Sequence, residues 1–208
     1  MILGEMLNKD VLEEVKSEVI KVENNREPFN KVKVYYRFRA NEISIKDRLI
    51  KYFFDRMLEA RLKKEFSSRN IELIDVICID KKNIDENDNF ILIYKLNDLI
   101  DIDKIHIDII KELVEKGFEN EEYVVQATIL KNTLIQIFSE EVEVNSEDIC
   151  TEFIDNFFED KAIILVKDQC NEVIENIDSI NIEDINKLLL SILNNYCKIV
   201  LSEGKHNK

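Results

Sequence analysis

The chain has 208 residues, of which 45% are hydrophobic and 35% charged, and its formal net charge is −14. This composition provides enough apolar residues for a packed core and speaks against an intrinsically disordered chain. The acidic balance speaks against a general nucleic-acid binder, because neutralising phosphates needs a basic face. With only 3 Gly, 1 Pro and no Trp, the sequence favours long helices over a many-turned sandwich or barrel.

The sequence predicts a cytoplasmic protein that neither spans nor binds a membrane. No basic region precedes the first apolar residues, and Glu5 and Asn8 interrupt them, so we expect no secretory signal. No apolar run is long enough to span a bilayer. The four cysteines lie far apart without any C-x-x-C pair, which is typical of reduced thiols in a cytoplasmic protein.

Charge is distributed unevenly along the chain. Residues 31–70 hold twelve Lys or Arg against five Asp or Glu, a local net charge of +7. Residues 71–160 hold seven basic against twenty-four acidic residues, a local net charge of −17. Such asymmetry bears on the partners of a protein more than on its fold.

The first predicted elements lie on the two sides of the only proline. Residues 8–24 have helical spacing of apolar residues, but their end, residues 18–22, is equally compatible with a strand. Pro28 then breaks the chain. In residues 32–36, Val32, Val34 and Tyr36 alternate with Lys33 and Tyr35, and this period of two predicts a strand.

Residues 44–67 predict a long amphipathic helix. Ser44 is a suitable N-cap, and Asp47 lies in the first turn. Two neighbouring rows at helical spacing give a broad apolar face: Leu49, Phe53, Met57 and Ala60, and Ile50, Phe54, Leu58, Leu62 and Phe66. On the opposite side, Lys51, Asp55, Glu59 and Lys63 predict a solvated face of alternating charges.

Two β-branched stretches, residues 71–79 and 90–96, flank a polar turn and predict an antiparallel hairpin. The fold class predicted for the whole chain is therefore α+β. It has a small antiparallel sheet covered by one long helix, followed by an all-helical C-terminal domain. We place the boundary near residue 103, with domains at 1–103 and 104–208.

The second half shows helical periodicity throughout. Residues 103–116 predict a helix that ends at Gly117, and residues 120–139 predict another. Asn145 or Ser146 would cap a third helix, which carries Phe153, Phe157 and Phe158. Asn181 would open a last helix, whose apolar face is Ile185, Leu188, Leu189, Ile192, Leu193 and Tyr196.

No motif for catalysis or for a metal or nucleotide cofactor is present. The two histidines, His106 and His206, have no second histidine or cysteine at ligand spacing, so each is better explained as a solvated or core-edge residue than as a metal ligand. The three glycines are isolated and form neither a phosphate loop nor a nucleophile elbow. We therefore expect no enzyme activity and no cofactor.

Two features remain as candidate binding surfaces. Phe153, Phe157 and Phe158 could line an exposed apolar cradle, although aromatic residues at helical spacing usually belong to a bundle core. Arg37 and Arg39 flank Phe38 and could form a basic docking tip, or simply be solvated arginines at the end of a strand.

The order of elements resembles trigger factor, the bacterial nascent-chain chaperone. In its ribosome-binding domain, a G-F-R-x-G-K-x-P loop precedes a helix and then a hairpin whose last strand follows an acidic turn. Phe38 and Arg39 match the Phe-Arg pair of that loop. Residues 130–150 are similar to a helix and the following segment in the helical domains of trigger factor and SurA-type chaperones, and residues 97–110 leave no room for an isomerase domain.

This resemblance implies an ATP-independent chaperone or escort for unfolded or nascent polypeptide, without isomerase activity. It implies weak ribosome or partner docking through Arg37, Phe38 and Arg39. Polypeptide would bind to an apolar helical surface, with these candidate residues: Phe138, Val142, Val144, Phe153, Phe157 and Phe158. The alternatives are a non-catalytic interaction module or homodimeric assembly factor, whose helix faces would be equally apolar, and an enzyme whose active site carries no recognisable motif.

Overall fold

A computed structural model describes residues 18–24, 29–37, 44–81, 89–97, 102–139, 173–193 and 196–204. The strands in these ranges are β1 (Glu18–Asn24), β2 (Asn30–Arg37), β3 (Leu73–Lys81), β4 (Asn89–Leu96) and β5 (Tyr196–Gly204). The helices are α2 (Ile45–Ser68), α3 (Ile102–Lys116), α4 (Asn120–Ser139) and α7 (Ile182–Leu193), and residues 173–177 are also helical.

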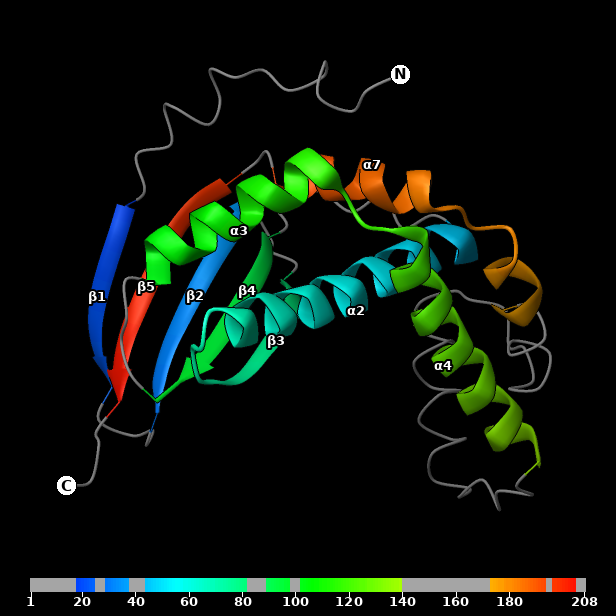
Figure 1. The fold of residues 1–208 in the computed structure, drawn as a ribbon, viewed down its shortest axis with the longest axis horizontal. Helices are drawn as coiled ribbons and strands as arrows, with labels where there is room; N and C mark the ends of the chain where they lie inside the picture. Colours follow the sequence, from blue (N-terminus) through cyan, green and yellow to red (C-terminus); the bar gives the residue numbers. More distant parts are fainter. Residues whose placement is uncertain are drawn as a thin grey trace, which may run out of the picture.

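The five strands form one mixed sheet in the order β1-β5-β2-β4-β3 (Figure 1). The predicted hairpin is confirmed, since β3 and β4 pair antiparallel, and β4 pairs antiparallel with β2. The last strand, β5, lies between the two earliest ones, parallel to β1 and antiparallel to β2. Residues 18–24 are therefore a strand rather than a helix, and residues 8–17 lie outside the described residues.

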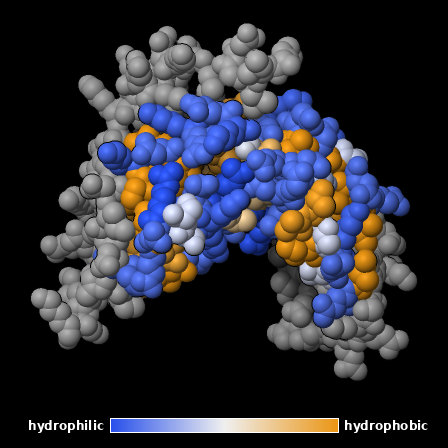
Figure 2. Space-filling model, viewed as in Figure 1, coloured by the Kyte–Doolittle hydropathy of each residue, from blue (hydrophilic) through white to orange (hydrophobic). Residues whose placement is uncertain are grey.

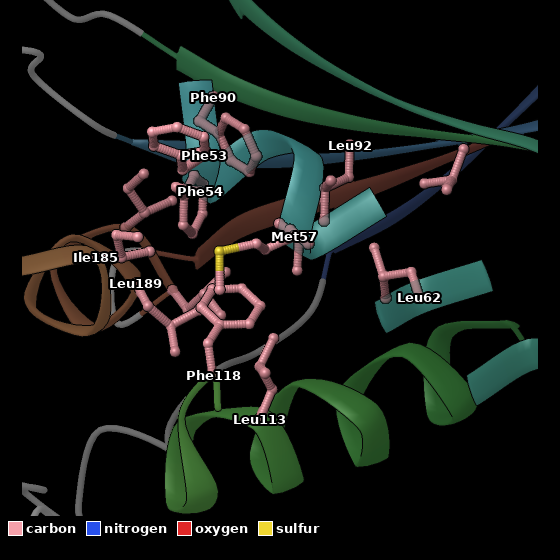
Figure 3. Packing of buried hydrophobic residues seen from close by; sticks show 14 of the residues in the cluster. Phe53, Phe54, Met57, Leu62, Phe90, Leu92, Leu113, Phe118, Ile185 and Leu189 are labelled. Atoms are coloured by element: carbon pink, nitrogen blue, oxygen red, sulfur yellow. The ribbon is translucent and has the colours of Figure 1, made fainter. Parts of the chain in front are cut away.

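The alternation in β2 sorts its side chains between the two faces of the sheet, as predicted. Val32, Val34 and Tyr36 are fully buried, whereas Lys33 and Tyr35 are only half-buried. Successive side chains of a strand point to opposite faces, so the buried set marks the face that the helices cover. Figure 3 shows this arrangement, with the strands on one side and α2, α3 and α7 on the other.

The predicted long helix is confirmed and supplies the centre of the core. Ser44 caps α2: its hydroxyl accepts from the Asp47 N–H at 3.1 Å, and the Asp47 carboxylate accepts from the Ser44 N–H at 3.2 Å. Phe53, Phe54 and Met57 contact the sheet residues Phe90 and Leu92 on one side and residues of α3 and α7 on the other (Figure 3). The row ends sooner than expected, because Ala60 is exposed.

The charged side of α2 is not the solvated face that its pattern predicted. Lys51 is only 5% exposed, and its ammonium group lies 2.7 Å from the Asp55 carboxylate and 4.9 Å from the centroid of the Phe90 ring. Glu59 accepts a hydrogen bond from the backbone N–H of Cys78, at 3.0 Å. These side chains turn inward because α2 packs along β3, an edge strand whose outward N–H groups need acceptors.

The helices α3 and α4 begin and end close to the predicted positions, and α7 begins close to its predicted start. Gly117 ends α3 with φ of +70°, a backbone conformation that favours glycine. Asn181 caps α7, since its side-chain oxygen accepts from the Asp184 N–H at 2.9 Å. Asn186 of α7 then binds both the N–H and the C=O of Phe118, which fixes α7 against the turn between α3 and α4.

The predicted α+β class is confirmed, but the second half is not helical to its end. Tyr196 was expected on the inner face of the last helix; instead α7 ends at Leu193 and Tyr196 begins β5. Asn194 and Asn195 are poor helix formers, and the apolar, β-branched stretch Cys197–Leu201 suits a buried strand. The predicted division near residue 103 stays a prediction, although the sheet draws strands from both sides of it.

Candidate functional site

His106, on α3, is a buried titratable group whose pKa is strongly perturbed. It is 1% exposed and lies between two buried tyrosines of the sheet. The Tyr36 hydroxyl on β2 is 2.6 Å from His106 Nε2, and the Tyr94 hydroxyl on β4 is 2.6 Å from His106 Nδ1. This cluster, Tyr36–His106–Tyr94, joins α3 to two central strands.

Burial keeps the cluster uncharged. Desolvation lowers the pKa of His106 from 6.5 to about 3, so the ring is neutral at physiological pH. Desolvation also raises the pKa of Tyr94 well above its ordinary value. A neutral imidazole has one donor and one acceptor nitrogen, so both are used by the two hydroxyl groups. The cluster is sealed from solvent and holds the fold together rather than presenting a reactive group.

The described residues contain no group of three or more His, Cys, Asp or Glu side chains that could hold a metal ion. His106 has both ring nitrogens bonded to tyrosines, and His206 lies outside the described residues. The described part of the chain therefore offers neither a metal centre nor an exposed catalytic histidine.

A shallow hollow of about 620 Å³ lies at the turn from α2 to β3. Its lining includes both polar and apolar exposed side chains, among them Lys63, Asn70 and Ile74. Since it has no buried polar group directed into it from among these residues, it lacks the convergent polar contacts of a small-molecule site.

The largest exposed aliphatic side chains gather instead on α4. Val124, Val125, Ile129 and Ile135 are each half or more exposed, from 50% to 57%. Figure 2 shows apolar surface along this helix, at the lower right of the view. We call the side of α4 that carries these four residues its outer face.

The outer face of α4 carries almost no charge. Between Tyr123 and Ser139 the only charged residue is Lys131, in a chain that is 35% charged. The hydroxyls of Thr128 and Thr133 donate to the helix backbone, to Val124 C=O at 2.7 Å and to Ile129 C=O at 3.0 Å. Their polar atoms are thereby engaged locally, which makes this face still less polar.

Contacts on its inner side fix α4 to the rest of the fold. Arg61 of α2 forms a two-pronged salt bridge with Glu122, with distances of 2.8 and 2.5 Å. The Tyr123 hydroxyl donates to the Ile177 carbonyl at 2.5 Å, and Lys131 pairs with Asp178 at 2.6 Å. Since this helix is anchored on one side and apolar on the other, its outer face has the character of a contact surface.

The residues predicted for binding are mostly outside the described ranges. Arg37 ends β2, where its backbone pairs with Asn89, and the backbone of Phe138 lies in the last turn of α4. The structure describes neither of these two side chains. Outside the described residues lie the other candidates: Phe38, Arg39, Val142, Val144, Phe153, Phe157 and Phe158.

Sequence patterns alone did not identify the outer face of α4 or the histidine cluster. The pattern of residues 120–139 predicted a helix but not which apolar residues it buries: Ala127 is buried, whereas Val124 is exposed. The absence of charge over residues 123–139, apart from Lys131, was the signal that a second apolar face exists.

No family model and no curated protein matches this sequence. Solved structures do match it. The first half of the periplasmic protease PqqL from Escherichia coli has a TM-score of 0.67 at 12% identity, over 92% of this chain and 43% of that one. The peptidase M16 inactive domain from Pseudomonas fluorescens has a TM-score of 0.58 at 10% identity, over 91% and 43%.

The ferredoxin protease FusC, solved as a mutant in complex with Arabidopsis ferredoxin, has a TM-score of 0.63 at 11% identity, over 91% of this chain and 22% of that one. The chain shares its fold with M16-type peptidase proteins. It spans between about a fifth and just under half of the length of these three chains.

The resemblance to trigger factor is therefore wrong, and so is the chaperone function drawn from it. It rested on the order of strand, helix and hairpin, which different folds share. The match to M16-type structures extends over about nine-tenths of the chain. The alternative of a non-catalytic interaction module is compatible with this fold.

Proposed function

We propose that this chain is a non-catalytic protein-interaction module with an M16-type peptidase fold, and that it contacts another polypeptide through the outer face of α4. The observation that carries the proposal is the apolar, nearly uncharged surface of that helix. One structural neighbour is itself described as an inactive domain, which supports a use of this fold without catalysis.

The histidine content supports a non-catalytic role. The zinc-peptidase motifs H-E-x-x-H and H-x-x-E-H both need two histidines separated by three residues. Here His106 is followed by Ile107, Asp108, Ile109 and Ile110, and the other histidine is His206. Since His106 is also buried between two tyrosines, it is unsuited to bind zinc without disrupting the core.

A polypeptide is the class of partner that the neighbours favour. The ferredoxin protease was solved with a protein, Arabidopsis ferredoxin, bound to it. In the PqqL half and the Pseudomonas domain, this fold occupies less than half of a longer chain and so lies beside further polypeptide. A helix that is apolar on both sides is stable in water only when most of its surface is covered.

A photoreactive amino acid at Ile129 tests this contact in cells that express the protein. We expect a discrete crosslinked adduct from Ile129, whose side chain is half exposed on the outer face of α4. Ala60 provides the matched control, because it is exposed on α2, away from that face. Equal yields of adduct from Ile129 and Ala60, or no adduct from either, would contradict the proposal. Mass spectrometry of the Ile129 adduct identifies the partner.

A second copy of the chain is the first partner to test. Copies with a net charge of −14 repel one another, and the outer face of α4 adds little to that repulsion because it is nearly uncharged. We expect sedimentation velocity to show a dimer that strengthens with added salt, because salt screens the repulsion. The substitutions Val125→Lys and Ile129→Lys should yield a monomer; a wild-type monomer at every concentration would assign the surface to a different protein.

Three further assignments belong to the proposal. Arg37, Phe38 and Arg39 stay candidates for partner docking, which Arg37→Ala with Arg39→Ala would weaken. The cytoplasm is the proposed compartment because the four cysteines are scattered without any C-x-x-C pair, and cell fractionation tests it. In the described part of the chain, no helix combines the length and apolar character needed to cross a membrane.

A further inference from the structure

The face of the sheet that points away from the helices carries an ordered pattern of its own. Strand pairing places its residues in three rows across β2, β4 and β3. These rows are Tyr35–Ile91–Ile79, Lys33–Ile93–Ile77 and Lys31–Lys95–Asp75. We call these nine residues the open sheet face.

The open sheet face is accessible and unusually apolar. Ile79 is 40% exposed, and Ile77 and Ile93 are half-buried, as expected for side chains on an uncovered sheet with neighbours on both sides. Ile91 is buried between its cross-strand neighbours Tyr35 and Ile79. The solvent face of an antiparallel sheet is ordinarily polar, so a strip of four isoleucines indicates contact with another surface.

Lysines lie next to the isoleucines in two places: Lys33 on β2 is beside Ile93, and Lys31 and Lys95 form the row at one end. Lys31, Lys33 and Lys95 all belong to this face, and its single acid, Asp75, pairs with Lys63 of α2 at 3.1 Å. That hydrogen-bonded lysine lowers the pKa of Asp75. Lys33 and Lys95 therefore give this face positive charge on a molecule whose net charge is −14.

An aromatic ring holds two of these lysines in place. The ammonium groups of Lys31 and Lys95 each lie 5.7 Å from the centroid of the Phe29 ring. Such cation–π contacts favour a fixed position for each charge over a freely moving side chain. The lysines thus form a defined basic border rather than a diffuse positive surface.

The edge of the sheet next to this face is closed to an added strand. On β3, the Cys78 N–H donates to Glu59 at 3.0 Å, and the Val76 N–H donates to the Asp75 side chain at 2.9 Å. A strand added at β3 would need these N–H groups. A partner that reaches this region therefore meets the face of the sheet.

We propose that the open sheet face binds an acidic polypeptide segment whose carboxylates pair with Lys33 and Lys95 and whose apolar side chains cover the isoleucines. The charge pattern selects this occupant, because an acidic segment is attracted here and repelled by the rest of the molecule. The inference rests on the proposed function, and it adds the chemistry of the partner and a second surface, distinct from α4.

Fluorescence anisotropy tests the inference, using the full chain and a labelled synthetic peptide in which Glu alternates with Leu. We expect saturable binding that weakens as salt is added, and no binding of the matching peptide in which Lys replaces Glu. A labelled oligonucleotide serves as a second probe. If it binds as well as the acidic peptide, the surface recognises negative charge in general and the proposal is overturned.

The triple variant Lys31→Glu, Lys33→Glu and Lys95→Glu should lose about tenfold in affinity, because it reverses the two pairing lysines and the charge beside them. The matched control is Lys64→Glu, Lys104→Glu and Lys111→Glu, which makes the same change in net charge at exposed helical positions. Equal affinities for the two triple variants, or no binding of the acidic peptide to wild type, would overturn the proposal.

Two further variants separate this inference from the proposed function. If circular dichroism shows that the glutamate variant is unfolded, the corresponding Lys→Gln variant takes its place and should also lose affinity. Val125→Lys with Ile129→Lys changes only the outer face of α4 and should leave peptide binding unchanged. Failure of the α4 crosslink alone would therefore reject the α4 contact, and failure of the peptide alone would reject the open sheet face.

Discussion

His106 shows how one buried polar residue can be fully satisfied by the fold. Its two ring nitrogens are bonded to hydroxyls from β2 and β4. Each of those bonds contributes about 1 kcal/mol net, whereas leaving either hydroxyl buried without a partner costs about 1–3 kcal/mol. The cluster therefore acts mainly by specifying how α3 sits on the sheet.

The buried histidine should make the protein less stable in mild acid. The pKa of His106 is about 3 in the folded chain, against 6.5 for an ordinary histidine. Between these two values the unfolded chain binds a proton at this residue and the folded chain does not. Unfolding free energy should fall by about 1.5 kcal/mol between about pH 6.5 and about pH 5, a window above most carboxylate titrations. Urea unfolding across this window measures the loss.

His106→Gln is the control for this pH dependence. Glutamine keeps one donor and one acceptor group but does not titrate, so the variant should show a flatter pH profile even if it is less stable overall. An unchanged slope in His106→Gln would show that the acid sensitivity arises elsewhere.

The sequence predicted the burial of Tyr36 but not the burial or the partners of His106. The alternation in residues 32–36 correctly placed Tyr36 on the buried face. His106, flanked by two isoleucines, was expected to be solvated or at the core edge, yet it is fully buried. Its partners lie 70 and 12 positions away, and no local pattern encodes which distant hydroxyl groups a side chain will meet.

At the scale of elements, the turn from α3 to α4 depends on a single glycine. Gly117 has φ of +70°, and a Cβ added there would lie 3.0 Å from the Asn186 side-chain amide. Asn186 is the residue that binds the Phe118 backbone on both sides. The backbone conformation and the close contact both exclude a larger residue.

Gly117→Ala should therefore destabilise the protein by about 1–2 kcal/mol, since it combines a left-handed conformation with a displaced hydrogen-bonding side chain. Thermal unfolding measures the shift. Glu115→Ala, at an exposed position of the same helix, is the control and should change little. A Gly117→Ala variant as stable as that control would contradict the role assigned to this turn.

The bounds of elements with strong periodicity were predicted well, but the contacts that these elements make with one another were not. The bounds of α2 and its N-cap followed from Ser44 and the apolar rows. The burial of Lys51 and Glu59 did not follow, because their charges suggested solvent and only the position of β3 explains why they turn inward. A short apolar run such as Cys197–Leu201 is compatible with either a helix or a strand until its neighbours are known.

At the scale of the whole molecule, β5 is the strand that joins the two ends of the chain. It pairs with β1 over Glu18–Asn24 and with β2 from Lys31 to Tyr36. Pairing across so large a separation in sequence leaves no local signal. The order of the earlier elements therefore suggested trigger factor, whereas the fold over 92% of the chain matches an M16-type structure.

Removal of β5 should abolish cooperative folding. A chain ending at Leu193 would leave β1 without its partner strand and one edge of β2 unpaired, exposing backbone groups that need partners. We expect the sharp urea transition to be lost. A chain ending at Gly204 keeps β5 and should unfold like wild type. Cooperative unfolding of the shorter chain at the wild-type midpoint would contradict the position of β5.

The central claim is that this M16-type fold acts by contact and not by catalysis. The most direct measurement incubates the purified chain with an unfolded protein and added zinc, follows the products by mass spectrometry, and determines the zinc retained after dialysis. The account predicts no cleavage above that of the substrate alone and no stoichiometric zinc, because the sequence has no pair of histidines at ligand spacing. About one bound zinc ion per chain, with cleavage that a chelator abolishes, would contradict it.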